Sequence, residues 1–199
     1  MRLAHIDRMR AIAVLCMVQV HTAAIVPPRG MTVGDPAAFV AAAFGGMAAP
    51  MFVMISGWGI HMGATRRANR GQMMATDWIA WLIPRVVLLL FCQLLVNVLL
   101  NIERGGRFEW HTPGVLSLLA IAALLAPALV RLGMQFRVFL MLAMAVSPML
   151  LGDAAGLDWA WWERIASEGP SEWVARLLWN GTYPALPWLF FVLLGTLVY

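Results

Sequence analysis

The stretch WLIPRVVLLLFCQLLVNVLL, residues 81–100, holds twenty residues with a single charge, that of Arg85. A transmembrane helix needs about 20 predominantly apolar residues to cross a hydrocarbon core about 30 Å thick. Five more apolar runs accompany it, at residues 11–26, 37–62, 115–130, 138–151 and 186–199. We therefore predict an all-α, polytopic integral membrane bundle of about six transmembrane helices. The run at 138–151 is the least secure span, so it could form a tilted hairpin with the run before it, or one of the two could be re-entrant.

Composition excludes a soluble globular domain. Hydrophobic residues make up 62% of the 199 residues and charged residues only 12%, about half the charge of an average soluble chain. All 14 basic residues are arginine. This bias, together with the many alanines, suggests a GC-rich bacterial source and hence the bacterial inner (plasma) membrane.

Basic charge is placed unevenly along the chain. With the N-terminus inside, nine arginines fall on the inner side with two acids, and five arginines fall on the outer side with eight acids. The positive-inside rule therefore predicts a cytoplasmic N-terminus. The net charge of +4 is then explained by orientation in the membrane, without a nucleic-acid partner. The inner arginines are Arg2, Arg8, Arg10, Arg66, Arg67, Arg70, Arg85, Arg131 and Arg137.

The two ends of the chain show neither a cleaved leader nor a closing polar flank. Asp7, Arg8 and Arg10 precede the first apolar run, and no small-residue cleavage site closes it. The last run reaches Tyr199 without a terminal charge. We expect residues 1–199 to form a single transmembrane domain that lacks further C-terminal helices.

Arg10 and His21 both lie on the first predicted helix, eleven residues apart. Eleven residues bring a helix to within about 20° of whole turns and raise it by about 16 Å, so both side chains point the same way. An ionisable side chain at that depth is costly and marks a functional site by default. We predict an imidazole held between helices, above a guanidinium near the inner face with which Asp7 can pair. The structural alternatives are an interhelical hydrogen bond for His21 and a topology anchor for Arg10.

Two patterns indicate how the helices pack. Gln93, Asn97 and Asn101 recur every four residues, so their amides share one face that should turn into the bundle. We interpret this face as a helix–helix contact, with the lining of an acceptor site as the alternative. Small residues recur in the same way along residues 41–49 and predict a closely approaching neighbour.

The remaining polar and aromatic residues have structural interpretations. Five tryptophans lie in the predicted outer segment 152–183, where we expect an aromatic belt or, alternatively, stacking on a sugar. Cys16 and Cys92 lie inside apolar runs, so neither a disulfide nor a metal site is predicted. Three histidines fall at predicted helix ends or loops and are expected to be solvated or interfacial: His5, His61 and His111.

Five stretches in collinear order carry a family resemblance. IDRMRAIAVLCMVQVH (residues 6–21) resembles a D-x-x-R-G start, with Ala11 in place of the glycine. APMFVMISGWGI (49–60) resembles a Pro-x-Phe, Ser-Gly second helix, and WLIPRVVLLL (81–90) an arginine-bearing start of a third. GVLSLLAIAALL (114–125) and YPALPWLFFVLLG (183–195) resemble G-V-L and Pro-Trp-Leu helices. These stretches resemble the transmembrane acyltransferase superfamily, and within it the catalytic domain of heparan-alpha-glucosaminide N-acetyltransferase and its bacterial relatives.

The resemblance implies an enzyme, an acyltransferase that depends on acyl-CoA. It would move an acetyl or similar acyl group from cytoplasmic acyl-CoA to an extracytoplasmic sugar, glycan or lipid-linked acceptor, and no metal is implied. Arg10 and His21 also resemble the arginine, ten residues, histidine pattern of the acyltransferase-3 branch. The animal lysosomal members carry their active histidine in the first outer loop, where residues 29–36 here hold none. His21 is therefore the residue that can match the catalytic role.

The chemistry of the implied roles is simple. Neutral imidazole titrates near neutral pH and suits a base that takes the proton of the acceptor. The guanidinium groups of Arg10 and Arg85 can bind the phosphates of coenzyme A bidentately. Weaker candidates for lining the substrate are Asp7, Ser56, Gln93 and Asn97.

Two other classes of function stay open at this point. In a transporter or flippase the buried polar face would be a pathway, although the chain shows no inverted repeat. In a non-catalytic assembly subunit the same helices would only pack. The lipid bilayer is the common partner of all three classes, and an oligomer is compatible with each.

Overall fold

The computed structural model describes residues 4–25, 35–72 and 74–198, and every regular element in these ranges is helical. The longer helices are α1 (Ala4–Ile25), α2 (Pro36–Asn69), α3 (Ala75–Leu99), α6 (Met134–Leu151) and α9 (Ala185–Leu197). Shorter helices and turns connect them: η1 (Ile102–Arg104), α4 (Val115–Leu124), α5 (Ala126–Arg131), η2 (Gly152–Ala155), α7 (Trp161–Ile165), α8 (Pro170–Ala175) and η3 (Arg176–Asn180). The prediction of an all-α fold is confirmed.

Three helices of the described chain are long and apolar enough to cross a membrane. They are Pro36–Asn69, Ala75–Leu99 and Met134–Ala155. The pair Pro170–Asn180 and Ala185–Leu197, which is bent by 44°, makes a fourth if it is one span. The described part of each of the six apolar runs is largely helical, but the structure supports three or four spans, and the expected six are not confirmed.

The run at 138–151, expected to be the least secure span, lies in a helix long and apolar enough to cross a membrane, whereas the run at 115–130 is divided between α4 and α5. The chain breaks between α4 and α5, because Pro127 in the first turn of α5 has no N–H to continue the hydrogen bonding of α4. α6 is longer than predicted and begins at Met134. The charge of Arg137, which marked the expected boundary, is accommodated by a partly buried side chain, whose Nη1 donates to the carbonyl oxygen of Thr196 at 2.7 Å.

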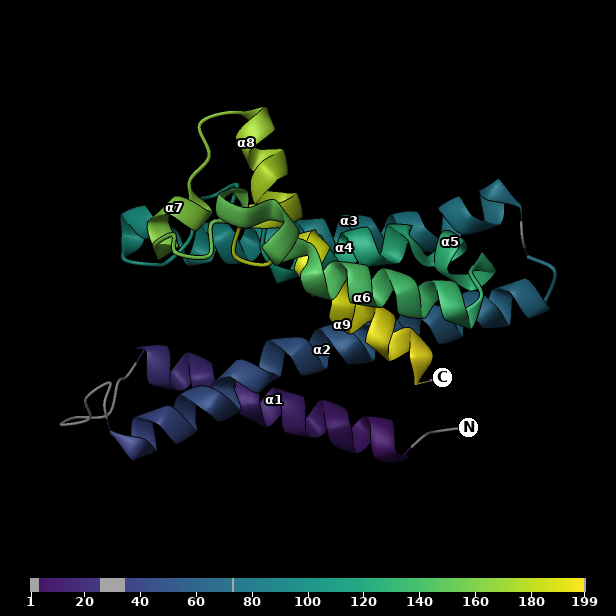
Figure 1. Ribbon diagram of the computed structural model, residues 1–199, viewed down its shortest axis with the longest axis horizontal. Coiled ribbons are helices and arrows are strands. Elements are labelled where there is room, and N and C mark those ends of the chain that lie inside the picture. Colours follow the sequence, from purple (N-terminus) through teal and green to yellow (C-terminus); the bar gives the residue numbers. More distant parts are fainter. Residues whose placement is uncertain (1–3, 26–34, 73, 199) are drawn as a thin grey trace.

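α2 is the central helix, with α1 along it from Gly45 to Met62 and α9 across its second half (Figure 1). A Cβ on Gly45 would lie 2.7 Å from the Cβ of Val20 on α1. A Cβ on Gly57 would overlap the carbonyl oxygen of Val192 on α9, and one on Gly195 would overlap that of Met54 on α2. Gly57 and Gly195 therefore let the backbones of α2 and α9 touch. Gly45 lets the side chain of Val20 approach closely, as predicted for residues 41–49.

Charge separates along the bundle. We name the arginine end as the end at which α1, α3 and α6 begin and α2 and α9 finish, on the right in Figure 1. Eight described arginines and two acids belong to it. Eight acids lie at the opposite end or on the segment 152–184, and Arg2 and Arg29 lie outside the described residues. The eight arginines are Arg8, Arg10, Arg66, Arg67, Arg70, Arg85, Arg131 and Arg137.

The segment 152–184 folds onto the connection between α3 and α4. The indole of Trp161 donates to the carbonyl oxygen of Arg107 at 2.8 Å, and that of Trp173 donates to the carbonyl oxygen of His111 at 2.7 Å. The guanidinium of Arg176 stacks over the ring of Trp159 at 4.7 Å. These three tryptophans make contacts within the protein. Neither a lipid-facing aromatic belt nor a surface on which a sugar stacks requires such contacts.

Candidate functional site

α1 carries Arg10 and His21 on one side of a continuous helix, as their spacing predicts. Ile6 and Ala13 are buried against the rest of the protein, and Arg10 and His21 flank that contact on α1. The expected pair between Arg10 and Asp7 is present, with Nη1 and Oδ1 3.8 Å apart and both side chains 53% exposed. A pair so exposed contributes little to stability but keeps the guanidinium near the arginine end.

The imidazole of His21 differs from our expectation of a ring held between helices, because the structure places it on the exposed side of α1. Its Nδ1 lies 2.9 Å from the carbonyl oxygen of Met17, one turn earlier. A carbonyl oxygen only accepts, so Nδ1 carries the hydrogen and Nε2 of the neutral ring keeps its lone pair. The geometry therefore fixes the tautomer that can act as a base through Nε2.

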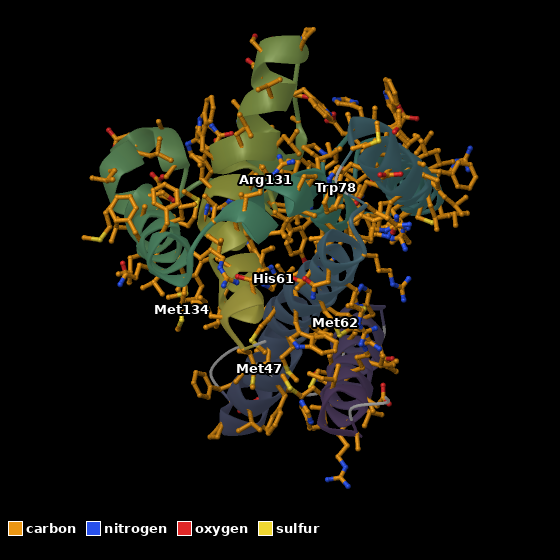
Figure 2. The ribbon with its side chains drawn as sticks, turned by 90° about the vertical axis from the view of Figure 1, so that its right-hand side faces the viewer. Met47, His61, Met62, Trp78, Arg131 and Met134 are labelled. Carbon is orange, nitrogen blue, oxygen red and sulfur yellow. The ribbon has the colours of Figure 1, made fainter. Side chains whose placement is uncertain are left out.

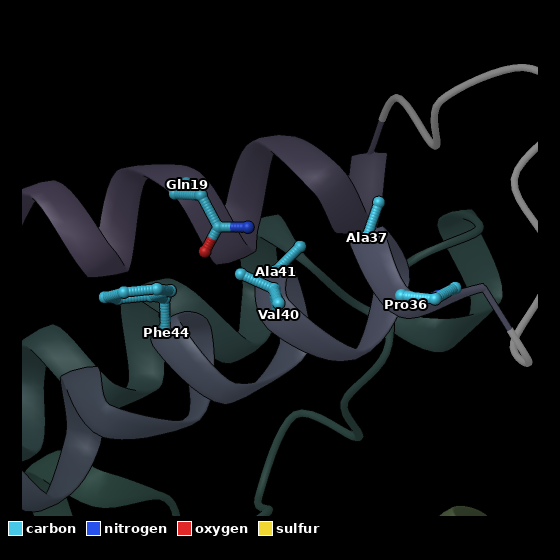
Figure 3. Close-up of a pocket in the computed structure, with 6 residues that line it drawn as sticks. All are labelled: Gln19, Pro36, Ala37, Val40, Ala41 and Phe44. Carbon is cyan, nitrogen blue, oxygen red and sulfur yellow. The ribbon is translucent and has the colours of Figure 1, made fainter.

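A pocket of about 510 Å³ opens between α1 and α2 away from the arginine end. Figure 3 shows the amide of Gln19 over Val40 and Ala41 of α2. Gln19 and His21 are two residues apart and point about 160° apart on a helix, so His21 faces away from this pocket. The oxygen Oε1 of Gln19 is buried without a hydrogen-bond partner among the described residues. The full lining is Gln19, Pro36, Ala37, Val40, Ala41 and Phe44.

Arg85 on α3 is exposed and is held by the aromatic ring one turn before it. Its Nη1 donates to the carbonyl oxygen of Trp81 at 2.6 Å, and its guanidinium lies 4.8 Å from the centre of the Trp81 ring. The guanidinium of Arg67 on α2 lies 5.2 Å from the same ring. Trp81 therefore gathers two cations from neighbouring helices, an arrangement that suits an anion. Arg10 lies on α1 and Arg85 on α3, and these two helices do not pack closely against each other.

Gln93 and Asn97 face the inside of the bundle, as predicted. Gln93 Nε2 donates to Asn97 Oδ1 at 2.8 Å, and Gln93 Oε1 accepts from the backbone N–H of Leu116 at 3.2 Å. Asn97 Nδ2 donates to the carbonyl oxygens of Thr112 at 2.8 Å and Trp110 at 3.1 Å. These bonds tie α3 to the start of α4 and fit the helix-contact interpretation. Ser56 is half-buried beside Gly57, where α2 meets α9.

His61 and Arg137 form a polar cluster that sequence reasoning missed. His61 is buried on α2, contrary to the expectation of a solvated or interfacial side chain. Arg137 Nη1 lies 3.1 Å from His61 Nε2 and donates also to the carbonyl oxygen of Thr196. Figure 2 looks onto the arginine end and places His61 beside the yellow ribbon of α9. The only signal in the sequence was that His61 stands inside an apolar helix, a residue type that is rare at such a position.

The fold and the charge separation define an all-α integral membrane protein that carries basic groups at one end and, on α1, an imidazole that is bonded to Met17 through Nδ1 and not through Nε2. Among residues 4–25, 35–72 and 74–198, no three His, Cys, Asp or Glu side chains gather as metal ligands.

The chain belongs to the heparan-alpha-glucosaminide N-acetyltransferase catalytic family, whose model matches residues 2–199. The family implies a membrane N-acetyltransferase and uses acetyl-CoA as its co-substrate. No curated protein and no solved structure matches the chain. The likeness to the acyltransferase-3 branch depends on the spacing of Arg10 and His21 alone.

Proposed function

We propose that this chain transfers an acetyl group from cytoplasmic acetyl-CoA to an extracytoplasmic sugar, glycan or lipid-linked acceptor, with His21 as the general base. Family membership supports acetyl transfer and the donor. The gathering of eight arginines at the end where the chain begins supports a cytoplasmic N-terminus and a donor that enters from that side.

The hydrogen bond from His21 Nδ1 to Met17 is the observation that carries the choice of base. Nε2 takes the proton of the acceptor hydroxyl or amine while that oxygen or nitrogen attacks the thioester carbonyl. The new bond to the acyl carbon forms, the carbon–sulfur bond breaks, and the thiolate of coenzyme A leaves and regains a proton from the imidazolium. His61 suits this role less, because its Nε2 already accepts a hydrogen bond from Arg137.

Arg10 and Arg85 are the proposed contacts to the phosphates of coenzyme A. Both are exposed at the arginine end, and Arg67 adds a second cation beside Arg85 at the ring of Trp81. The rise of about 16 Å from Arg10 to His21 leaves room for the pantetheine arm along α1. The thioester and the acceptor would then meet on the side of α1 that α2 leaves uncovered.

Binding of acetyl-CoA to the full-length protein in nanodiscs tests the donor assignment. Arg10→Gln and Arg85→Gln should each weaken binding by about tenfold, because each removes a charged hydrogen-bond donor to phosphate. Arg104→Gln, an exposed arginine at the opposite end, is the matched control and should bind as the wild type does.

The same preparation distinguishes an acyltransferase from a transporter. An acetyltransferase releases free coenzyme A thiol in step with acetylation of an added amino sugar or glycan. A wild-type protein that binds no acetyl-CoA, or that moves a sugar across vesicles without acetylating it, contradicts the proposed function.

A further inference from the structure

An apolar cavity of about 240 Å³ lies between α5, α6 and α9. Every residue that lines it is aliphatic or a methionine, so a water molecule inside would find no polar side-chain partner there. Its walls include Leu129 of α5, Leu140 and Met144 of α6, and Leu189, Val192 and Leu193 of α9.

Arg137 lies outside the cavity wall, about one helical turn from it toward the arginine end. Arg137 precedes Leu140 by three residues on α6, and Thr196, whose carbonyl oxygen it bonds, follows Leu193 by three residues on α9. Each step is about one helical turn along the same face. A cation fixed by the carbonyl oxygen of Thr196 therefore lies about one turn beyond the apolar wall.

Arg137 retains unused hydrogen-bonding capacity. Its Nη1 serves both His61 and Thr196, whereas its Nε is buried without a partner among the described residues. The side chain as a whole is partly exposed, although Nε itself is buried. A buried, unpaired donor in a native structure calls for a ligand, ion or water to satisfy it.

We propose that this cavity holds one acyl chain of an anionic phospholipid, with the phosphate of that lipid bound by Arg137. An apolar cavity with a guanidinium about one turn beyond its wall matches a hydrocarbon tail joined to an anion, and guanidinium binds phosphate bidentately. Leu132 also lines the cavity. Arg131, which directly precedes it in the sequence, adds a second positive charge. Basic sites between helices at a membrane surface select anionic headgroups in this way. The proposal uses no residue of the proposed acetyl transfer, so either can fail alone.

Native mass spectrometry of the full-length protein tests the lipid site. The protein is released from micelles that contain equal amounts of phosphatidylglycerol and phosphatidylcholine, and the retained lipid is counted. The wild type should retain one phosphatidylglycerol with a preference of about fivefold for each contributing arginine. Equal retention of the two lipids would mean that the cavity binds an acyl chain whatever the charge of its headgroup. This result would overturn the proposal.

Two variants that introduce a tryptophan on α6 distinguish lipid binding in the cavity from lipid binding elsewhere on the surface. Met144→Trp fills the cavity and should abolish retention of phosphatidylglycerol, whereas Leu142→Trp places the same side chain on an exposed position of the same helix and should retain it. Retention by Met144→Trp, or equal loss in both variants, contradicts the site.

Substitution of Arg137 tests the headgroup contact. Arg137→Lys keeps the charge and should keep the preference for phosphatidylglycerol, while Arg137→Gln should lose it by about fivefold. An unchanged preference in Arg137→Gln would contradict the assignment of the phosphate to this residue.

Discussion

At the scale of single residues, the hydrogen-bond partner of an imidazole decides what the ring can do. Nδ1 of His21 donates to the carbonyl oxygen of Met17 and leaves Nε2 unoccupied by that bond, whereas Nε2 of His61 accepts from Arg137. The first ring keeps the lone pair that the proposed proton transfer needs, whereas the second is bonded to a residue of α6. The local bond of His21 follows from helix geometry, but that of His61 joins residues 76 positions apart.

Asn97 is predicted to stabilise the fold through three hydrogen bonds. Its side chain is 2% exposed and connects Gln93 to the carbonyl oxygens of Trp110 and Thr112. Asn97→Ala should lower the free energy of unfolding by about 1–3 kcal/mol, because it leaves buried polar groups unpaired. Thermal unfolding in detergent, followed by tryptophan fluorescence, measures the change. Asn69→Ala, at the exposed end of α2, is the control, and equal melting temperatures for the two variants would refute the assignment.

At the scale of helices, the crossing of α2 and α9 depends on two glycines. Gly57→Ala and Gly195→Ala each place a Cβ against a backbone carbonyl, which cannot rotate away as a side chain can. Overpacking of this kind costs about 1–3 kcal/mol, so both variants should unfold at lower temperature than the wild type. Gly59→Ala meets nothing within 4 Å and is the matched control. Wild-type stability in all three variants would mean that α2 and α9 can move apart to admit each Cβ without any loss of stability.

Sequence patterns predicted the helices and the inward faces better than they predicted the spans. Long apolar runs and amides spaced four apart depend on local geometry alone, so α2, α3 and the Gln93 face agree with the structure. Apolarity alone did not reveal the break before Pro127, because the proline stands within an otherwise continuous run. The partly buried position of Arg137 depends on Thr196, a contact between distant segments that no local pattern encodes.

The candidate site was predicted in part. The shared side of Arg10 and His21 and the pair of Arg10 with Asp7 follow from helix spacing and are present. Which side α2 covers depends on tertiary packing, and the structure leaves the imidazole exposed where burial was expected. The second cation at Trp81 is Arg67, which belongs to α2. The sequence of the third apolar run could therefore not predict it.

At the scale of the whole molecule, the separation of arginines from acids predicts orientation in the membrane. In a background with Cys16 and Cys92 replaced by serine, Glu168→Cys should react with a membrane-impermeant maleimide in intact cells, and Arg70→Cys should react only after lysis. Both positions are exposed, so lack of reaction would not reflect burial. The reverse pattern would place the arginine end outside and would remove the proposed route for acetyl-CoA.

The central claim is that His21 removes the proton of the acceptor, and the rate of acetyl transfer by His21→Ala tests it most directly. The full-length protein, the His21→Ala variant and a His5→Ala control on the same helix are compared in proteoliposomes with acetyl-CoA and an acceptor glycan. We predict that His21→Ala loses about 10²–10⁴-fold in transfer rate while its binding of acetyl-CoA is unchanged, and that His5→Ala transfers normally. Transfer by His21→Ala at the wild-type rate would contradict the account.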